Sequence, residues 1–293
     1  MNVLVCGASG FVGRAACDAL RRRGHRVIAA ASSGRGADAI AIDFARDTDP
    51  ATWTPRLAGV DAVVNAVGVL RDSRRRPIAA VHEHAPRALF EACARAGVRR
   101  VVHVSALGIA GSHTAYARTK LAAEDALLAL GAAGRLDGVV VRPSVVFGRG
   151  GASSRMFLAL ARLPALLLPA AVRATRVQPV AVAELAETLA GLVDASPPAA
   201  RRLDAVGPEP VALGEFIASL RAQAGRAPAR VATLPGVLAR WSARAGDVVP
   251  VSPWCSETLA LLAADNTADP APFELALGRR ATRFDALLAG ALA

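Results

Sequence analysis

Apolar residues in the first half of the chain form short runs that alternate with stretches of helical periodicity. Strands are expected at residues 2–6, 26–31, 39–43, 62–65, 101–105 and 138–142, and helices at 11–23, 78–96 and 115–130. Gly24, Gly97 and Gly131 stand where these helices should end. The alternation predicts an α/β fold of the Rossmann type, a doubly wound parallel sheet with helices on both faces.

The pattern becomes less regular after Phe147. A return strand is expected near 176–180, a helix at 184–194, a strand at 203–206, and helices at 215–224 and 257–264. These elements predict a Rossmann-type domain of residues 1–148 and about 176–206. Residues of about 149–175 and 207–293 would form a smaller, mostly helical lobe for a substrate or partner. The apolar stretch 157–172 is broken by Arg162, Pro164 and Pro169, so no transmembrane segment is expected.

Composition narrows the class of protein. The chain has 293 residues, of which 53% are hydrophobic and 20% charged, as in a globular protein with a full core. The N-terminus carries no basic leader, so a cytoplasmic location is expected. The four cysteines have no paired CxxC spacing and are expected to be reduced and buried, with no metal site.

The net charge of +11 raises the question of nucleic-acid binding. The basic residues are scattered along the chain, and the aromatic content of 4% offers few platforms for stacking bases, so no nucleic-acid partner is expected. Short arginine runs at 21–23 and 74–76 are interpreted as solvated surface.

Three glycines, Gly7, Gly10 and Gly13, follow the first strand and open the first helix. Glycine at these places permits a sharp turn, a close approach of a pyrophosphate and close packing of the helix on the strand, while the helix N-terminus favours an anion. The motif predicts a nucleotide site, whose turn also includes Ser9, Phe11 and Val12. The alternative is a glycine-rich turn without a ligand.

The end of the second strand bears on the choice of coenzyme. NAD sites usually carry a carboxylate there, but this chain has Ser32-Ser33-Gly34-Arg35. Hydroxyls with Arg35, and also Arg14, could hold a 2′-phosphate, which favours NADP(H) over NAD(H). The alternative is an ordinary polar turn.

Tyr116 is the only tyrosine and Lys120 the only lysine of the chain. Four residues apart on a helix, they would share one face. An ammonium beside a phenol favours the phenolate and lowers the phenol pKa, which suits an acid/base residue. The alternative is a surface helix that carries both residues by chance.

These motifs resemble the short-chain dehydrogenase/reductase superfamily, in its extended and atypical branches. The resemblance covers residues 1 to about 210 and includes Gly-Ala-Ser-Gly-Phe-Val-Gly at 7–13, Asn-Ala-Val-Gly at 65–68, Tyr-Ala-Arg-Thr-Lys at 116–120 and Arg-Pro-Ser at 142–144. Val-Ser-Ala-Leu-Gly at 104–108, Gln-Pro-Val at 178–180 and residues 264–269 resemble more narrowly the group related to the nucleotide-binding accessory subunit of respiratory complex I, which is epimerase-like and NmrA-like.

The resemblance implies a role for each matching residue. Tyr116 would be the acid/base, Lys120 its pKa-lowering and ribose-binding partner, and Ser105 would hold the substrate oxygen. Asp43 would contact the adenine, and the remaining cofactor contacts would come from Asn65, Ala66, Val67, Gly68, Pro143 and Val145. Asp43, Asn65 and Pro143 have plain structural alternatives as a turn cap, a strand-end polar group and a strand terminator. Ser105 stands only eleven residues before Tyr116, closer than in active extended members, and His82 is interpreted as a packing residue of its helix.

Two functions follow. The first is a hydride-transferring oxidoreductase acting on a carbonyl or alcohol; the apolar stretch 157–168 with Trp241 and Trp254 suggests a lipid, quinone or terpenoid substrate, or else a plain core. The second is a non-catalytic NADPH-binding scaffold or redox sensor, like the complex I subunit. The resemblance leaves open a peripheral association with a membrane or a respiratory complex, and the oligomeric state stays open.

Overall fold

A computed structural model describes residues 1–34, 38–195, 201–248, 254–262 and 264–292. The chain divides into two compact units. The larger comprises Met1–Arg142 with Ala183–Leu203, and the smaller comprises Pro143–Val182 with Asp204–Ala293.

The larger unit is built on a seven-stranded sheet with the strand order β11-β6-β5-β4-β1-β2-β3. The strands are β1 (Asn2–Cys6), β2 (Arg26–Ala31), β3 (Ala39–Ala41), β4 (Ala62–Asn65), β5 (Arg100–Val104), β6 (Asp137–Pro143) and β11 (Arg202–Ala205). Strands β1 to β6 pair in parallel throughout. The order steps outward from β1 in both directions, so the carboxyl ends of β1 and β4 form the crevice where such sheets bind ligands.

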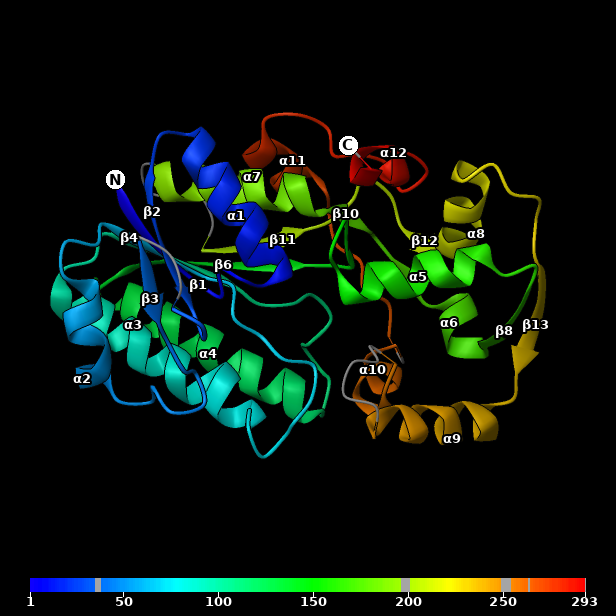
Figure 1. Ribbon diagram of the computed structural model, residues 1–293, viewed down its shortest axis with the longest axis horizontal. Coiled ribbons are helices and arrows are strands. Elements are labelled where there is room, and N and C mark those ends of the chain that lie inside the picture. The colour runs from blue at the N-terminus through cyan, green and yellow to red at the C-terminus, as the bar shows by residue number, and fades with distance from the viewer. Residues whose placement is uncertain (35–37, 196–200, 249–253, 263, 293) are drawn as a thin grey trace. The chain divides into compact units, whose positions relative to one another are not determined.

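Helices cover the sheet on both faces. They are α1 (Phe11–Arg22), α2 (Pro50–Trp53), the short 3-10 turn Thr54–Leu57, a π-turn at Ala80–His84 that leads into α3 (Ala85–Ala96), α4 (Ala115–Ala132) and α7 (Val182–Asp194). In Figure 1, α1 and α7 lie on one face and α3 and α4 on the other. The predicted doubly wound α/β fold is therefore confirmed.

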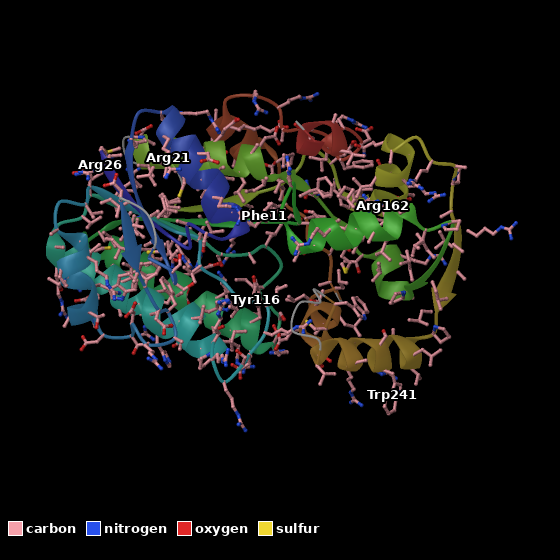
Figure 2. All side chains as sticks on the ribbon, in the orientation of Figure 1. Phe11, Arg21, Arg26, Tyr116, Arg162 and Trp241 are labelled. Carbon is pink, nitrogen blue, oxygen red and sulfur yellow. The ribbon has the colours of Figure 1, made fainter. Side chains whose placement is uncertain are left out.

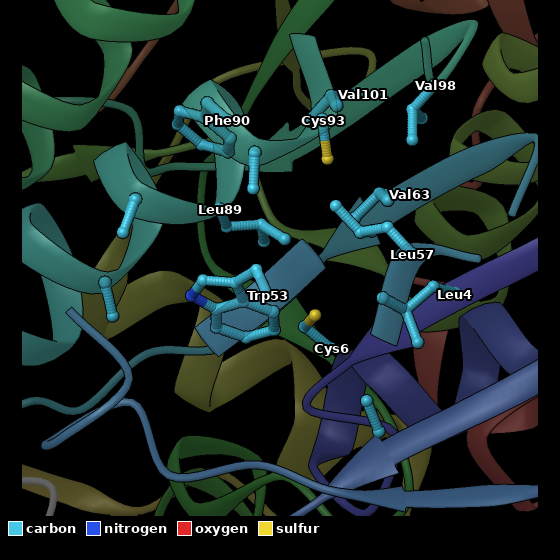
Figure 3. Packing of buried hydrophobic residues seen from close by; sticks show 14 of the residues in the cluster. Leu4, Cys6, Trp53, Leu57, Val63, Leu89, Phe90, Cys93, Val98 and Val101 are labelled. Atoms are coloured by element: carbon cyan, nitrogen blue, oxygen red, sulfur yellow. The ribbon is translucent and has the colours of Figure 1, made fainter. Parts of the chain in front are cut away.

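The central strands β1, β4 and β5 are buried, and most of their residues are apolar. Leu4, Val63 and Val101 from three adjacent strands pack against Leu89 and Trp53 from the helices below them (Figure 3). The fully buried Trp53 satisfies its indole N–H on the carbonyl of Asp47, at 2.8 Å. This core holds the ends of β1 and β4 in place.

The prediction of a return strand at 176–180 was wrong, because this segment does not belong to the seven-stranded sheet. The segment forms two strands of two residues each, β9 (Arg176–Val177) and β10 (Val180–Ala181), which pair with β12 (Val211–Ala212) and β7 (Val146–Phe147). Pro179 has no N–H to donate, and the Gln178 side chain donates to Gly207 O at 3.0 Å, so a continuous ladder cannot form here. The seventh strand of the sheet is β11.

The smaller unit is mostly helical. Its remaining elements are α5 (Ala152–Arg162), β8 (Ala165–Pro169), α6 (Ala170–Ala174), α8 (Leu213–Gln223), β13 (Arg230–Leu234), α9 (Gly236–Asp247), α10 (Ser256–Leu261), α11 (Ala271–Leu277) and α12 (Leu287–Leu292). Its core is centred on edge-to-face contacts of Phe216 with Phe147 and Phe157. The apolar stretch 157–168 therefore contributes to this core.

All four cysteines are free and buried, as predicted. Among the described residues, no helix combines the length and the hydropathy that crossing a membrane would require.

Candidate functional site

The turn between β1 and α1 depends on its glycines. Gly7 has a φ of +82°, and a Cβ there would lie 3.1 Å from the Ala66 carbonyl. A Cβ on Gly13 would lie 2.0 Å from Gly7 O, closer than any side chain can approach. Gly10 N donates to Gly7 O at 2.8 Å and caps α1, whose first turn carries no acidic side chain. The helix N-terminus is thus close to the turn, and the first turn of the helix adds no negative charge that would repel an anion.

A cavity of about 180 Å³ opens at this turn. It lies at the carboxyl edge of the sheet, where the ends of β1, β2 and β4 meet. Of the residues predicted to contact a cofactor, the structure brings together along this cavity Gly7, Ser9, Gly10, Ser32, Asp43, Ala66, Val67 and Gly68.

The other predicted residues lie elsewhere. Phe11, Val12 and Gly13 belong to the first turns of α1, and Asn65 is buried at the end of β4. Pro143 and Val145 belong to the smaller unit. Arg35 lies outside the described residues. Arg14, the alternative cation, donates to Ser9 O at 2.6 Å and so braces the glycine turn.

Arg76 also lines the cavity, which the sequence did not reveal. The arginine run 74–76 had been interpreted as solvated surface, and Arg76 is indeed exposed. Within the described part of the chain its guanidinium has no carboxylate at ion-pair distance, whereas the Asp43 carboxylate accepts from Ala45 N at 3.0 Å. The arginine run lies in the loop after β4, at the edge of the sheet where such folds bind ligands. This position in the sequence could have identified Arg76 as a residue of the site.

Tyr116 and Lys120 both project from α4, which begins at the cap Thr114, whose hydroxyl accepts from Ala117 N at 3.1 Å. The Lys120 side chain is buried and donates from Nζ to Val104 O at 3.0 Å. The Tyr116 ring, labelled in Figure 2, meets the His82 ring edge-on, with centroids 5.2 Å apart. The two predicted residues thus lie on one side of the helix, against β5 and the turn that holds His82.

Gly68 connects this pair with the cavity. A Cβ at Gly68 would lie 3.6 Å from Lys120 Nζ and 3.7 Å from His82 Nε2. His82 Nε2 also accepts from the backbone N–H of Val69, another cavity residue, at 2.9 Å. The cavity wall at residues 68–69 therefore lies next to Lys120 Nζ and is hydrogen-bonded to His82.

Burial decides the protonation states of these groups. It lowers the pKa of His82 to about 2, with Lys120 adding to the effect, so the imidazole is neutral and serves as an acceptor. It lowers the pKa of Lys120 to about 8, while Glu124 opposes the shift. It raises the pKa of Tyr116 to about 12.

The sequence-based expectation that Lys120 lowers the pKa of Tyr116 was wrong for this structure. A low-dielectric surrounding disfavours both the phenolate and the ammonium, and the Lys120 ammonium is held on the Val104 carbonyl. At neutral pH Tyr116 is a protonated phenol and Lys120 a largely protonated amine. This arrangement can donate a proton more readily than it can accept one.

Asn65 and Ser105 end two neighbouring strands. Asn65 Oδ1 accepts from Val67 N at 3.2 Å, and its amide nitrogen lies 3.2 Å from His103 Nδ1, so it shapes the loop that lines the cavity. Ser105 N donates to Val141 O at 2.8 Å. The buried Ser105 Oγ has no hydrogen-bond partner among the described residues, which is unusual for a buried hydroxyl.

Stability should report the cost of burying Lys120. Because its folded-state pKa is lowered to about 8, the protonated amine destabilises the folded protein below pH 8, and that cost is relieved as the pH rises toward the usual value of 10.5. We expect Lys120→Met to gain free energy of unfolding relative to the wild type at pH 7, and this advantage to shrink by about 2 kcal/mol by pH 9.5. Urea unfolding of both proteins at each pH measures the difference in their free energies of unfolding. The titration of the cysteines and of Tyr116 is common to both proteins and cancels in this difference. An advantage that stays constant with pH would contradict a lowered Lys120 pKa.

Comparison with known proteins agrees with this architecture. Sterol demethylase protein B of Methylococcus capsulatus is 30% identical over 172 residues, which are 50% of this chain and 52% of that protein. The chain thus spans about half the length of the curated relative it matches.

Solved structures show the same fold. UDP-glucose 4-epimerase of Bifidobacterium longum, in complex with NAD⁺ and UDP, has a TM-score of 0.73 at 16% identity over 100% of this chain and 97% of that chain. The human epimerase family protein SDR39U1, solved with NADPH, has a TM-score of 0.71 at 22% identity over 99% of both chains.

A model of the NAD dependent epimerase/dehydratase family matches residues 3–167, more than half of the chain. The match begins in β1 and includes the glycine turn, the loop after β4 and both Tyr116 and Lys120. The chain therefore belongs to the NAD-dependent epimerase/dehydratase family.

Proposed function

We propose that this protein is an oxidoreductase that binds NADP(H) in the cavity after β1 and reduces the carbonyl group of an apolar substrate. One observation carries the proposal. The cavity wall at Gly68 and Val69 lies next to Lys120 and donates a hydrogen bond to His82, and His82 in turn packs on Tyr116, so a phenol and a cation lie close to the cavity at the glycine turn.

The residues of the site fit a dinucleotide. The glycine turn packs its backbone more closely than a Cβ at Gly7 or Gly13 would allow, and the N-terminus of α1 offers backbone N–H groups to a pyrophosphate. Asp43 would contact the adenine, and Lys120 would donate to ribose hydroxyls. When bound, the coenzyme supplies the hydride.

Tyr116 would supply the proton. With a pKa raised to about 12 it is protonated at neutral pH and so carries the proton that carbonyl reduction requires. The Tyr116 hydroxyl would transfer its proton to the carbonyl oxygen of the substrate, and the resulting phenolate would regain a proton from solvent. The unpartnered Ser105 hydroxyl would hold the same substrate oxygen.

The apolar substrate class is supported by the relative from Methylococcus capsulatus, whose name assigns it to sterol demethylation. The aromatic residues that first suggested such a substrate do not carry this argument, because Phe157 and Trp254 pack in the core of the smaller unit. We therefore propose ketones on rigid lipid skeletons, such as 3-ketosteroids, as the first substrates to test. NADPH oxidation by the purified protein over a panel of such ketones and of short polar ketones measures this, and equal rates on both groups would contradict it.

We propose a preference for NADP(H) because no carboxylate stands at the end of β2, and the cavity is lined by Ser32 and by Arg76, which forms no ion pair with a described residue. Arg76→Ala is expected to weaken NADPH binding about tenfold, the scale of one charge-assisted contact, and to leave NADH binding unchanged. Fluorescence titration with each coenzyme measures both affinities.

Arg75→Ala is the matched control, because Arg75 belongs to the same exposed run and does not line the cavity. Equal losses for NADPH and NADH in Arg76→Ala would place Arg76 at a part of the coenzyme common to both. A wild-type protein that binds NADH more tightly would overturn the coenzyme preference itself.

A non-catalytic NADPH-binding scaffold is the second candidate. The observation that favours it is the raised pKa of Tyr116, which Lys120 does not lower in this structure. A scaffold would hold NADPH and oxidise it with no ketone of the panel.

A further inference from the structure

Helix α9 of the smaller unit has one face made of small residues. Ala239, Ala243 and Gly246 are buried and lie on one side of the helix. A Cβ on Gly246 would lie 2.1 Å from Trp254 O, so this face is packed closely against the segment that begins at Trp254. The helix is therefore attached to its unit through a narrow strip of small side chains.

The opposite face of α9 carries large apolar side chains in solvent. Val237, Leu238 and Trp241 are 55%, 53% and 64% exposed, and Val248 at the C-cap is 81% exposed. Their spacing of one, four and eleven residues places them on one side of the helix. Figure 2 shows Trp241 projecting away from the ribbon of α9. Such a stripe of exposed apolar groups, headed by a tryptophan, marks an interaction surface.

Positive charge borders this stripe. Arg240 and Arg244 are exposed on the same helix, and the Arg244 guanidinium lies 5.9 Å from the centre of the Trp241 ring. Neither arginine has a carboxylate at ion-pair distance in the part of the chain that the structure describes. The acidic residue of the helix, Asp247, accepts from Ser256 Oγ at 2.6 Å and Ser256 N at 2.8 Å. The positive charges of Arg240 and Arg244 beside the stripe are thus not neutralised by a described carboxylate, which favours an anionic partner.

We propose that α9 docks the protein on the surface of an anionic lipid bilayer. Val237, Leu238 and Trp241 would enter the boundary between headgroups and acyl chains, and Arg240 and Arg244 would meet the lipid phosphates. A lipid surface fits better than a protein groove because a single convex stripe with a tryptophan and flanking arginines matches the amphipathic helices that lie in the membrane interface. This docking stands independently of the reaction proposed above.

Co-sedimentation of the full-length protein with lipid vesicles tests the proposal. The anionic vesicles contain phosphatidylcholine with about one phosphatidylglycerol in three lipids. The protein is expected to bind them more tightly than vesicles of phosphatidylcholine alone. Arg240→Gln with Arg244→Gln should weaken binding to the anionic vesicles about 30-fold, from the contribution of each arginine near such a surface. Leu238→Ser with Trp241→Ser should weaken it at least about tenfold.

Leu275→Ser is the control, because Leu275 is 82% exposed on α11 and outside the stripe. It should bind like the wild type. Vesicles should also shift the tryptophan emission of the wild type to shorter wavelength, and Trp241→Phe should lose that shift while still binding.

Three results would overturn the proposal. One is a wild-type protein that sediments with neither kind of vesicle, and another is a Leu238→Ser/Trp241→Ser variant that binds as well as the wild type. The third is light scattering that shows a wild-type dimer and a monomeric variant, because the stripe would then be covered by a second copy of the chain. Thermal unfolding of each variant checks that it is folded.

Discussion

Tyr116→Phe is expected to lower the rate of carbonyl reduction by about 10²–10⁴-fold and to leave NADPH affinity unchanged. The substitution removes the hydroxyl that donates the proton and keeps the aromatic ring, so the edge-on contact with His82 is preserved. Neither the glycine turn nor the cavity wall loses an atom. Steady-state oxidation of NADPH with the best ketone of the panel measures the rate, and fluorescence titration measures the affinity.

The same variant separates the two candidate functions. A wild-type protein that reduces a ketone and a Tyr116→Phe variant that binds NADPH without turnover together support the oxidoreductase. Retention of turnover in the variant would remove Tyr116 from the proton transfer. A wild-type protein that holds NADPH and reduces none of the ketones would establish the scaffold.

Gly13→Ala is expected to lower the affinity for either dinucleotide by more than about 100-fold and to destabilise the larger unit by about 1–3 kcal/mol or more. Its Cβ would stand 2.0 Å from Gly7 O, a backbone atom that can move only if the glycine turn opens. Opening the turn displaces Gly7 and Gly10, both of which line the cavity. Titration with NADPH and NADH measures the affinities, and urea unfolding measures the stability.

Gly191→Ala provides the matched control. Gly191 is also a helical glycine of the larger unit, in α7, but a Cβ there would have no atom within 4 Å. This variant should bind dinucleotide normally and gain about 1 kcal/mol of stability, because alanine is the better helix former. Normal NADPH binding by Gly13→Ala would show that the glycine turn does not cradle the coenzyme.

Much of the larger unit could be predicted from its pattern. The bounds 2–6, 26–31 and 62–65 expected for three strands are those found for β1, β2 and β4. These strands are short apolar runs between glycines and polar residues, and buried parallel strands require that pattern. The smaller unit was less predictable, because α5, β8, β13 and α9 have weak local signals and depend on contacts between distant segments.

The local arrangement of residues was enough to place Gly7, Gly10 and Gly13 at a turn between a strand and a helix, and to set Tyr116 and Lys120 on one face of α4. Both follow from backbone geometry over a few residues, which the order of amino acids specifies directly.

Only the tertiary structure could bring Arg76 to the cavity, set Gly68 against Lys120 and His82, and raise the pKa of Tyr116. Side chains from the loop after β4 and from α4 meet because the sheet and its helices pack together, and no local pattern records which of them will meet. Burial, which sets the pKa values, is likewise a property of the packed fold.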